Sequence, residues 1–166
     1  MRTLIHRLLA LALLLGCVSM AQSQKKYTGP KPAKADIPYL LHAGALVETE
    51  SLMAKESQEK GALTYTIAGA TSAARTPLTE PILLFQSDKI NPDKLSLFKL
   101  EVRAGNRMLV LPEPGKRKKD GPRPLFLMVT PLSPGLFRVE VNEFLENGEY
   151  CLSPDGSNQV FCFTTF

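Results

Sequence analysis

Two cysteines near the C-terminal end, Cys151 and Cys162, are the residues whose chemistry follows most directly from their spacing. The segment from Asp155 to Asn158 between them has the composition of a tight turn. A turn centred on Gly156 and Ser157 places Cys151 directly opposite Cys162 on two antiparallel strands. In an oxidising compartment this pair would form a cross-strand disulfide. A turn shifted by one residue would instead leave two separate buried thiols.

The apolar residues of the same hairpin favour the same register. With Cys151 opposite Cys162, four large side chains share the other face of the hairpin. They are Tyr150, Leu152, Phe161 and Phe163. The requirement for a buried face and the sulfur pairing therefore agree.

Residue types that commonly carry catalysis are scarce in this sequence. Of its two histidines, His6 lies between Arg2 and Arg7 near the N-terminus, and His42 follows the apolar strip Tyr39 to Leu41. The sequence has no C-x-x-C pair, no phosphate-binding glycine loop and no G-x-S-x-G nucleophile turn. We interpret His42 as a packed or surface histidine. We expect no catalytic residue, no metal ligand and no cofactor; the alternative is a secreted enzyme of an unrecognised type.

The first 21 residues are typical of an export signal. Arg2 and Arg7 precede an apolar run from Leu8 to Leu15, and Ser19 to Ala21 offer the small residues that a signal peptidase reads. Even when extended through Gly16 and Cys17 to Val18, a stretch of 11 residues, the run is shorter than the roughly 20 that a bilayer span requires. We therefore expect export, with cleavage leaving a mature chain of about 145 residues, a length suited to one domain.

Cys17 leaves a second outcome open for this segment. Leu14 to Cys17 resembles a bacterial lipobox, in which a small residue precedes a cysteine that is lipidated and becomes the new N-terminus. Lipidation of Cys17 would anchor the protein to a membrane, whereas cleavage after Ala21 would leave it without an anchor.

The overall charge argues against a nucleic-acid partner. Lys and Arg number 20 against 16 Asp and Glu, and the formal charge of +4 falls to +2 when Arg2 and Arg7 leave with the signal. Nucleic-acid-binding proteins usually concentrate a large positive excess on one face. We expect no nucleic acid among the partners of this chain.

One dense basic segment lies among prolines in the second half of the chain. Its members are Lys116, Arg117, Lys118, Lys119 and Arg123. Such a segment could contact polyanions, anionic lipid head groups or acidic glycans. The alternative is a solvated connection whose charges suppress aggregation.

The N-terminal half has weak structural signals. Residues 22–36 are rich in Lys, Pro, Gly and Ala, a composition typical of a flexible linker. Residues 37–79 are poorly defined, and within them the good helix formers of residues 49–60, followed by Gly61, predict a short helix.

From Pro81 onward the apolar residues follow the period of two that is typical of strands. Seven short runs bounded by turn-forming residues predict seven strands. They are Ile82–Gln86, Phe98–Val102, Met108–Leu111, Leu125–Val129, Phe137–Val141, Glu149–Leu152 and Gln159–Phe163. This number of strands within residues 80–166 predicts an all-β sandwich of Greek-key type.

Leu145, Gly148 and Tyr150 form an L-x-x-G-x-Y pattern at the start of the penultimate predicted strand. This pattern resembles the tyrosine corner of immunoglobulin-like and fibronectin type III proteins. The resemblance covers roughly residues 80 to 166 and implies an antiparallel immunoglobulin-like β-sandwich in which the Tyr150 hydroxyl bonds to the backbone upstream. The chain departs from antibody domains because it has no Trp and no cysteine on the second strand. The resemblance implies a fold and no particular activity.

The lead segment, with Lys26 to Pro30 and Asp36 to Tyr39, is similar to small secreted bacterial proteins of unassigned function. Together these patterns indicate an exported, non-catalytic binding or structural protein of the bacterial envelope or exterior. We expect its partner to be another envelope or extracellular protein. A membrane would be a partner only through a lipidated Cys17.

Overall fold

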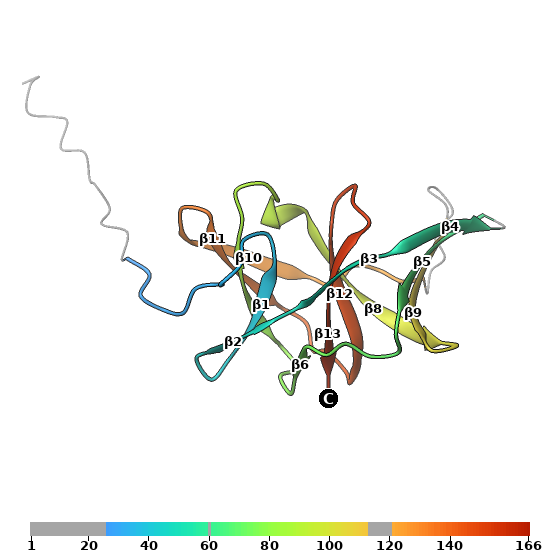
Figure 1. Ribbon diagram of the computed structural model, residues 1–166, viewed down its shortest axis with the longest axis horizontal. Helices are drawn as coiled ribbons and strands as arrows, with labels where there is room; N and C mark the ends of the chain where they lie inside the picture. The colour runs from blue at the N-terminus through green and yellow to red at the C-terminus, as the bar shows by residue number, and fades with distance from the viewer. Residues whose placement is uncertain (1–25, 60, 113–120) are drawn as a thin grey trace, which may run out of the picture.

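The computed structural model describes residues 26–59, 61–112 and 121–166, and this part of the chain is all-β. Its strands form two sheets (Figure 1). The smaller sheet has the order β10 (Leu127–Ser133), β11 (Leu136–Val141), β7 (Ile82–Gln86), β1 (Pro38–His42) and β2 (Ala45–Glu48). The larger sheet has the order β3 (Glu50–Met53), β13 (Gln159–Thr165), β12 (Gly148–Pro154), β8 (Leu95–Arg103), β9 (Asn106–Pro112), β5 (Ala62–Ala68) and β4 (Lys55–Glu59). These neighbours are all antiparallel, and the short β6 (Arg75–Thr76) adds a parallel pairing with β13.

The larger sheet closes on itself through a single stretch of chain. β3 pairs with β13 at one edge of the sheet, and β4, which follows after Ala54, pairs with β5 at the other edge. Between the two strands, the Ala54 amide donates a hydrogen bond to the Asn158 carbonyl at 2.8 Å. Figure 1 shows this stretch running from beside β13 to the far end of the molecule at β5. The closure removes the free edges that β13 and β5 would otherwise present.

Two hydrophobic cores follow from this arrangement. The first lies between the sheets and includes Leu40, Leu83, Phe85, Leu97, Val139, Val141, Leu145, Tyr150, Leu152, Phe161 and Phe163. The second lies inside the closed part of the larger sheet and contains Ala54, Ile67, Leu100, Leu109, Cys151, Val160 and Cys162. Because side chains alternate along a strand, β12 and β13 contribute to both cores and are buried on both faces.

The seven strands predicted after residue 80 are all present, as β7 to β13. The predicted helix over residues 49–60 is wrong, because β3 and β4 occupy this stretch. Leu52 and Ala54 point inward, while the intervening Met53 is exposed, so the stretch has the period of a strand. Helix propensity is a weak preference, and pairing with β13 and β5 outweighs it.

Residues 38–76, which the sequence leaves poorly defined, supply β1 to β6 and join both sheets. The linker expected over residues 22–36 is tied to the smaller sheet at its C-terminal end. Pro32 is buried, Lys34 pairs with Glu48 at 2.9 Å, and Asp36 accepts a hydrogen bond from Ser87 at 2.7 Å. These contacts need partners distant in sequence, which the composition of the linker alone does not indicate. The signal segment and Cys17 lie outside the described residues.

The predicted hairpin register is confirmed. In β12 and β13, Cys151 lies opposite Cys162, and Tyr150 lies opposite Phe163. The two cysteines form a disulfide whose Cα atoms are 4.0 Å apart, near the spacing of a pair that exchanges no backbone hydrogen bonds. The Tyr150 and Phe163 rings stack on the opposite face with centroids 5.8 Å apart.

The geometry at Tyr150 has the hydrogen bond that the L-x-x-G-x-Y pattern predicts. The buried Tyr150 hydroxyl donates to the Glu146 carbonyl at 2.8 Å. Leu145 is buried in the core between the sheets, and Gly148 begins β12. The corner therefore fastens the connection before β12 to the strand itself.

Replacement of Tyr150 by phenylalanine should lower the free energy of unfolding by about 1 kcal/mol, because it removes this bond and leaves the ring packing in place. Urea unfolding of the two proteins measures the difference. Tyr27→Phe is the matched control, since the Tyr27 hydroxyl donates to the Pro30 carbonyl at an exposed site. Equal losses of unfolding free energy in the two variants would show that the Tyr150 hydrogen bond stabilises the fold no more than an exposed one.

Candidate functional site: a cavity inside the closed sheet

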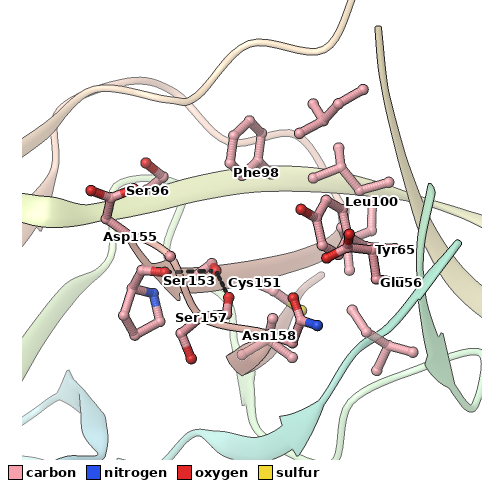
Figure 2. A pocket seen from close by; sticks show the side chains of 16 residues that line it. Glu56, Tyr65, Ser96, Phe98, Leu100, Cys151, Ser153, Asp155, Ser157 and Asn158 are labelled. Carbon is pink, nitrogen blue, oxygen red and sulfur yellow. Dashed lines mark hydrogen bonds between the residues drawn. The ribbon is translucent and has the colours of Figure 1, made fainter. Parts of the chain in front are cut away.

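The closed part of the larger sheet contains a cavity of about 340 Å³ beside the turn that joins β12 to β13 (Figure 2). Its lining comes from β4, β5, β8, β9, β12, β13 and that turn. The β3–β4 stretch contributes Glu56 to this lining, so the closure of the sheet supplies one side of the cavity.

The wall of the cavity is apolar. It is formed by Ile67, Phe98, Leu100, Leu109, Leu111, Val160 and Cys151 of the disulfide. The sequence builds this wall through strand alternation: Phe98 and Leu100 face inward from β8, while Lys99 and Glu101 between and beside them are exposed. The disulfide fixes the spacing of β12 and β13 at this wall.

The rim of the cavity is polar. Its members are Glu56, Tyr65, Ser96, Ser153, Asp155, Ser157 and Asn158. Figure 2 shows Glu56 and Tyr65 together with Leu100 at one end of the cavity, Ser96 and Asp155 at the other, and Phe98 between the two ends. The β12–β13 turn is held by the Ser153 hydroxyl, which donates to the Ser157 carbonyl at 3.3 Å.

Glu56 and Tyr65 are directly paired across β4 and β5. Partial burial, and then the negative charge of the Glu56 carboxylate, raise the pKa of the Tyr65 phenol above its ordinary value of 10.0. The phenol therefore stays protonated at neutral pH. This end of the cavity offers an acceptor in Glu56 and a neutral hydroxyl in Tyr65.

A buried ionic cluster lies on the inward side of β9 and β12, next to the apolar wall. Arg107, which is fully buried, pairs with Glu50 at 2.7 Å and lies 3.9 Å from Glu149. The Arg107 guanidinium also donates to the carbonyls of Ala68 and Gly69. Arg107 precedes the cavity residue Leu109 by two positions, and Glu149 precedes Cys151 by two, so the cluster continues the interior away from the turn.

Glu149 extends this cluster to the connection after β5. One carboxylate oxygen accepts from the Thr164 hydroxyl at 2.8 Å, and the other accepts from the Ser72 amide at 3.0 Å. The Ser72 hydroxyl donates to the Cys162 carbonyl at 3.1 Å. Arg107 and Glu149 therefore join β3, β5, β9, β12 and β13 at one end of the closed sheet.

Most of the basic segment, Lys116 to Lys119, lies outside the described residues. Arg123 is described, and it does not extend a free basic surface. Its guanidinium makes two hydrogen bonds to the Glu143 carboxylate, and Glu143 also accepts from the Phe126 amide. His42, at the end of β1, is exposed and is not among the residues that line the cavity.

Arg123 and the Phe126 amide lower the pKa of Glu143 from 4.5 to about 2. Because the pKa of Glu143 is lower in the folded than in the unfolded protein, the pairing stabilises the fold at pH values above 4.5. This stabilisation is lost as the pH falls toward 2. NMR titration of the Glu143 carboxyl should give a midpoint of about 2, and Arg123→Gln should raise it. Arg103→Gln is the control, because Arg103 pairs with Glu101 instead. An unchanged midpoint in Arg123→Gln would contradict the assigned cause.

The sequence interpretation singled out Cys151 and the turn from Asp155 to Asn158, but it missed the other cavity residues and the Arg107 cluster. The alternation of Phe98, Leu100 and Val102 predicts an inward face for β8; Phe98 and Leu100 do line the cavity, whereas Val102 is exposed. Nothing local indicates that β4 lies beside this face. Within the described residues, no three His, Cys, Asp or Glu side chains gather as a metal-binding group. Among the same residues, no helix is long and apolar enough to span a membrane. The arrangement is suited to enclosing a small apolar body under a polar rim.

No protein family, no characterised protein and no solved structure matches this chain.

Proposed function

We propose that this chain is an exported, non-catalytic binding protein that takes up a small, mainly apolar molecule in the cavity of its closed sheet. The observation that carries the proposal is the cavity itself: an apolar wall beneath a rim of carboxylate, hydroxyl and amide groups. Its volume of about 340 Å³ lies at the lower end of the range for ligand sites, roughly 300–1,000 Å³, and so fits a small ligand.

An immunoglobulin-like frame is the second part of the proposal, and the strand order supports it. The order β10-β11-β7-β1 corresponds to strands D, E, B and A of such a sandwich, and β13-β12-β8-β9 corresponds to G, F, C and C′. The Tyr150 corner then lies on strand F, where this fold places it. In this assignment β2 to β6 are an addition between strands A and B, and the cavity forms where the addition closes the G-F-C-C′ sheet.

Export is the third part. The basic residues and apolar run of the first 21 residues support it, as does the disulfide, because disulfides persist in oxidising compartments. The location would be periplasmic or extracellular, with an anchor only through Cys17. The same proposal includes a protein partner in the envelope or outside the cell, and an anionic surface that contacts Lys116 to Lys119. Its central claim is the ligand in the cavity.

Binding of the neutral fluorophore N-phenyl-1-naphthylamine tests the central claim. Burial of roughly 200 Å² of apolar surface at about 25 cal/mol per Å² contributes about 5 kcal/mol, and an ordering cost of roughly 1 kcal/mol leaves a dissociation constant of about 1 mM. The fluorescence should rise and saturate as the purified protein is added. A displacement titration with small apolar compounds then ranks the ligands.

Ser96→Phe should weaken this binding by about tenfold or more, because a ring at this rim position fills the cavity. Thr130→Phe is the matched control, since Thr130 is exposed on β10 and outside the cavity lining. Thermal melts establish that both variants are folded. Absent binding, or equal binding by Ser96→Phe and the unmodified protein, would overturn the proposal.

A further inference from the structure

We propose that the molecule bound in the cavity is a cationic amphiphile, an alkylammonium whose chain lies on the apolar wall and whose charged head lies at Glu56 and Tyr65. This inference rests on the proposed function, because it assigns a ligand class to the same cavity. It adds the sign and the position of the ligand's charge.

The wall determines the body of the ligand. The deep lining residues Leu109 and Val160 are buried and carry no hydrogen-bonding side-chain atoms, and the Cys151 sulfur is held in the disulfide. A polar group placed against this wall would lose its hydration without gaining a partner. The part of the ligand that lies on the wall is therefore a hydrocarbon.

The rim determines the head. The described lining contains two carboxylates, Glu56 and Asp155, and none of its side chains is Lys, Arg or His. A carboxylate or phosphate head would meet negative charge at either end of the cavity, whereas an ammonium head would be attracted. A cationic head is therefore favoured over a neutral one and strongly over an anionic one.

The two carboxylates are not equivalent. Asp155 and its neighbours Pro154 and Ser157 also line a separate hollow that contains Lys89 and Lys94. Lys89 pairs with Asp36 at 3.4 Å, but Lys94, whose carbonyl accepts from the Asp155 amide at 3.1 Å, places a positive charge on the same side of the turn as Asp155. Glu56 lies at the other end of the cavity, beside the Tyr65 ring (Figure 2). An aromatic face next to a carboxylate attracts a cation through both its quadrupole and the neighbouring charge. The head group is therefore placed at Glu56.

Three compounds with the same chain test the inference: octylammonium, octanol and octanoate, each titrated by calorimetry into the purified protein. Octylammonium should bind about tenfold or more tightly than octanoate, with octanol between them, and this preference should shrink in 1 M NaCl. Glu56→Gln should weaken octylammonium binding about three- to fivefold and leave octanol binding unchanged. Asp155→Asn should change octylammonium binding by less than about twofold.

Glu80→Gln is the control, because Glu80 is exposed and outside the cavity lining. Equal binding of the three compounds would overturn the ligand class and leave the proposed function standing. Tighter binding of octanoate would do the same. Loss of preference in Asp155→Asn but not in Glu56→Gln would overturn the placement of the head. Absence of binding by all three compounds, together with no fluorophore binding, would remove both the inference and the proposed function.

Discussion

Replacement of Arg107 by methionine is expected to lower the free energy of unfolding by about 3–5 kcal/mol, the largest effect of any single substitution considered for this chain. Arg107 is fully buried, and its charge lies between the carboxylates of Glu50 and Glu149. Methionine fills similar space but leaves Glu149 buried without its countercharge. It also leaves the Ala68 and Gly69 carbonyls without their donor. Urea unfolding measures the loss.

Arg103→Met is the matched control, because Arg103 lies on β8 and is exposed, where its pairing with Glu101 contributes little. A double variant isolates the contribution of the charge. Arg107→Met combined with Glu149→Gln should lower the free energy of unfolding by less than the sum of the two single effects, because the glutamine amide removes the unpaired charge. A loss below about 1 kcal/mol in Arg107→Met would contradict the role assigned to this cluster.

Removal of the disulfide should cost about 2–3 kcal/mol, the second largest effect, as expected from chain entropy for a sequence separation of 11 residues. Cys151→Ala with Cys162→Ala should unfold at a lower temperature and keep the fold, because Tyr150 and Phe163 still stack on the other face of the hairpin. The double variant compared with the oxidised protein in calorimetric melts measures this effect. A double variant as stable as the oxidised protein would contradict it.

Protein isolated from its native host adds a test of the compartment. Free-thiol counting under denaturing, non-reducing conditions should find no reactive thiol from Cys151 and Cys162. The intact mass of the same sample should give an N-terminus at Gln22 or a lipidated Cys17. Two reactive thiols, together with an intact Met1, would contradict export.

The sequence predicted best where the structure is local. The seven strands after residue 80 were visible because each carries its own period of two and its own turn residues. The Cys151–Cys162 register was also visible, since the turn at Gly156 fixes the pairing of the two strands it joins. The hydrogen bond from Tyr150 to Glu146 spans only four residues, and so a short motif could indicate it.

The helix expected over residues 49–60 shows where local signals failed. Its residues are good helix formers in isolation, yet Leu52 pairs with Val160 and Glu56 pairs with Tyr65 in strands distant from one another. The pairing of β4 with β5 is a local hairpin, but the pairing of β3 with β13 joins the two ends of the fold. Such a long-range pairing is decided by the sum of contacts in the folded state, and no window of the sequence contains that sum. For the same reason, the sequence did not indicate that strands among β1 to β6 belong to both sheets.

The sequence by itself determined that this chain is β-rich, where most of its C-terminal strands lie, and which cysteines face each other, because these properties depend on neighbouring residues. Only the tertiary structure decided that β3 and β4 close the larger sheet. That closure brings together Glu56, Tyr65 and Asp155 around one cavity, and it encloses Arg107 with Glu149. Glu56 and Tyr65 belong to one hairpin, but Asp155 follows β12 far along the chain, and Arg107 and Glu149 come from β9 and β12. Their meeting depends on long-range pairing that side-chain pattern alone does not specify.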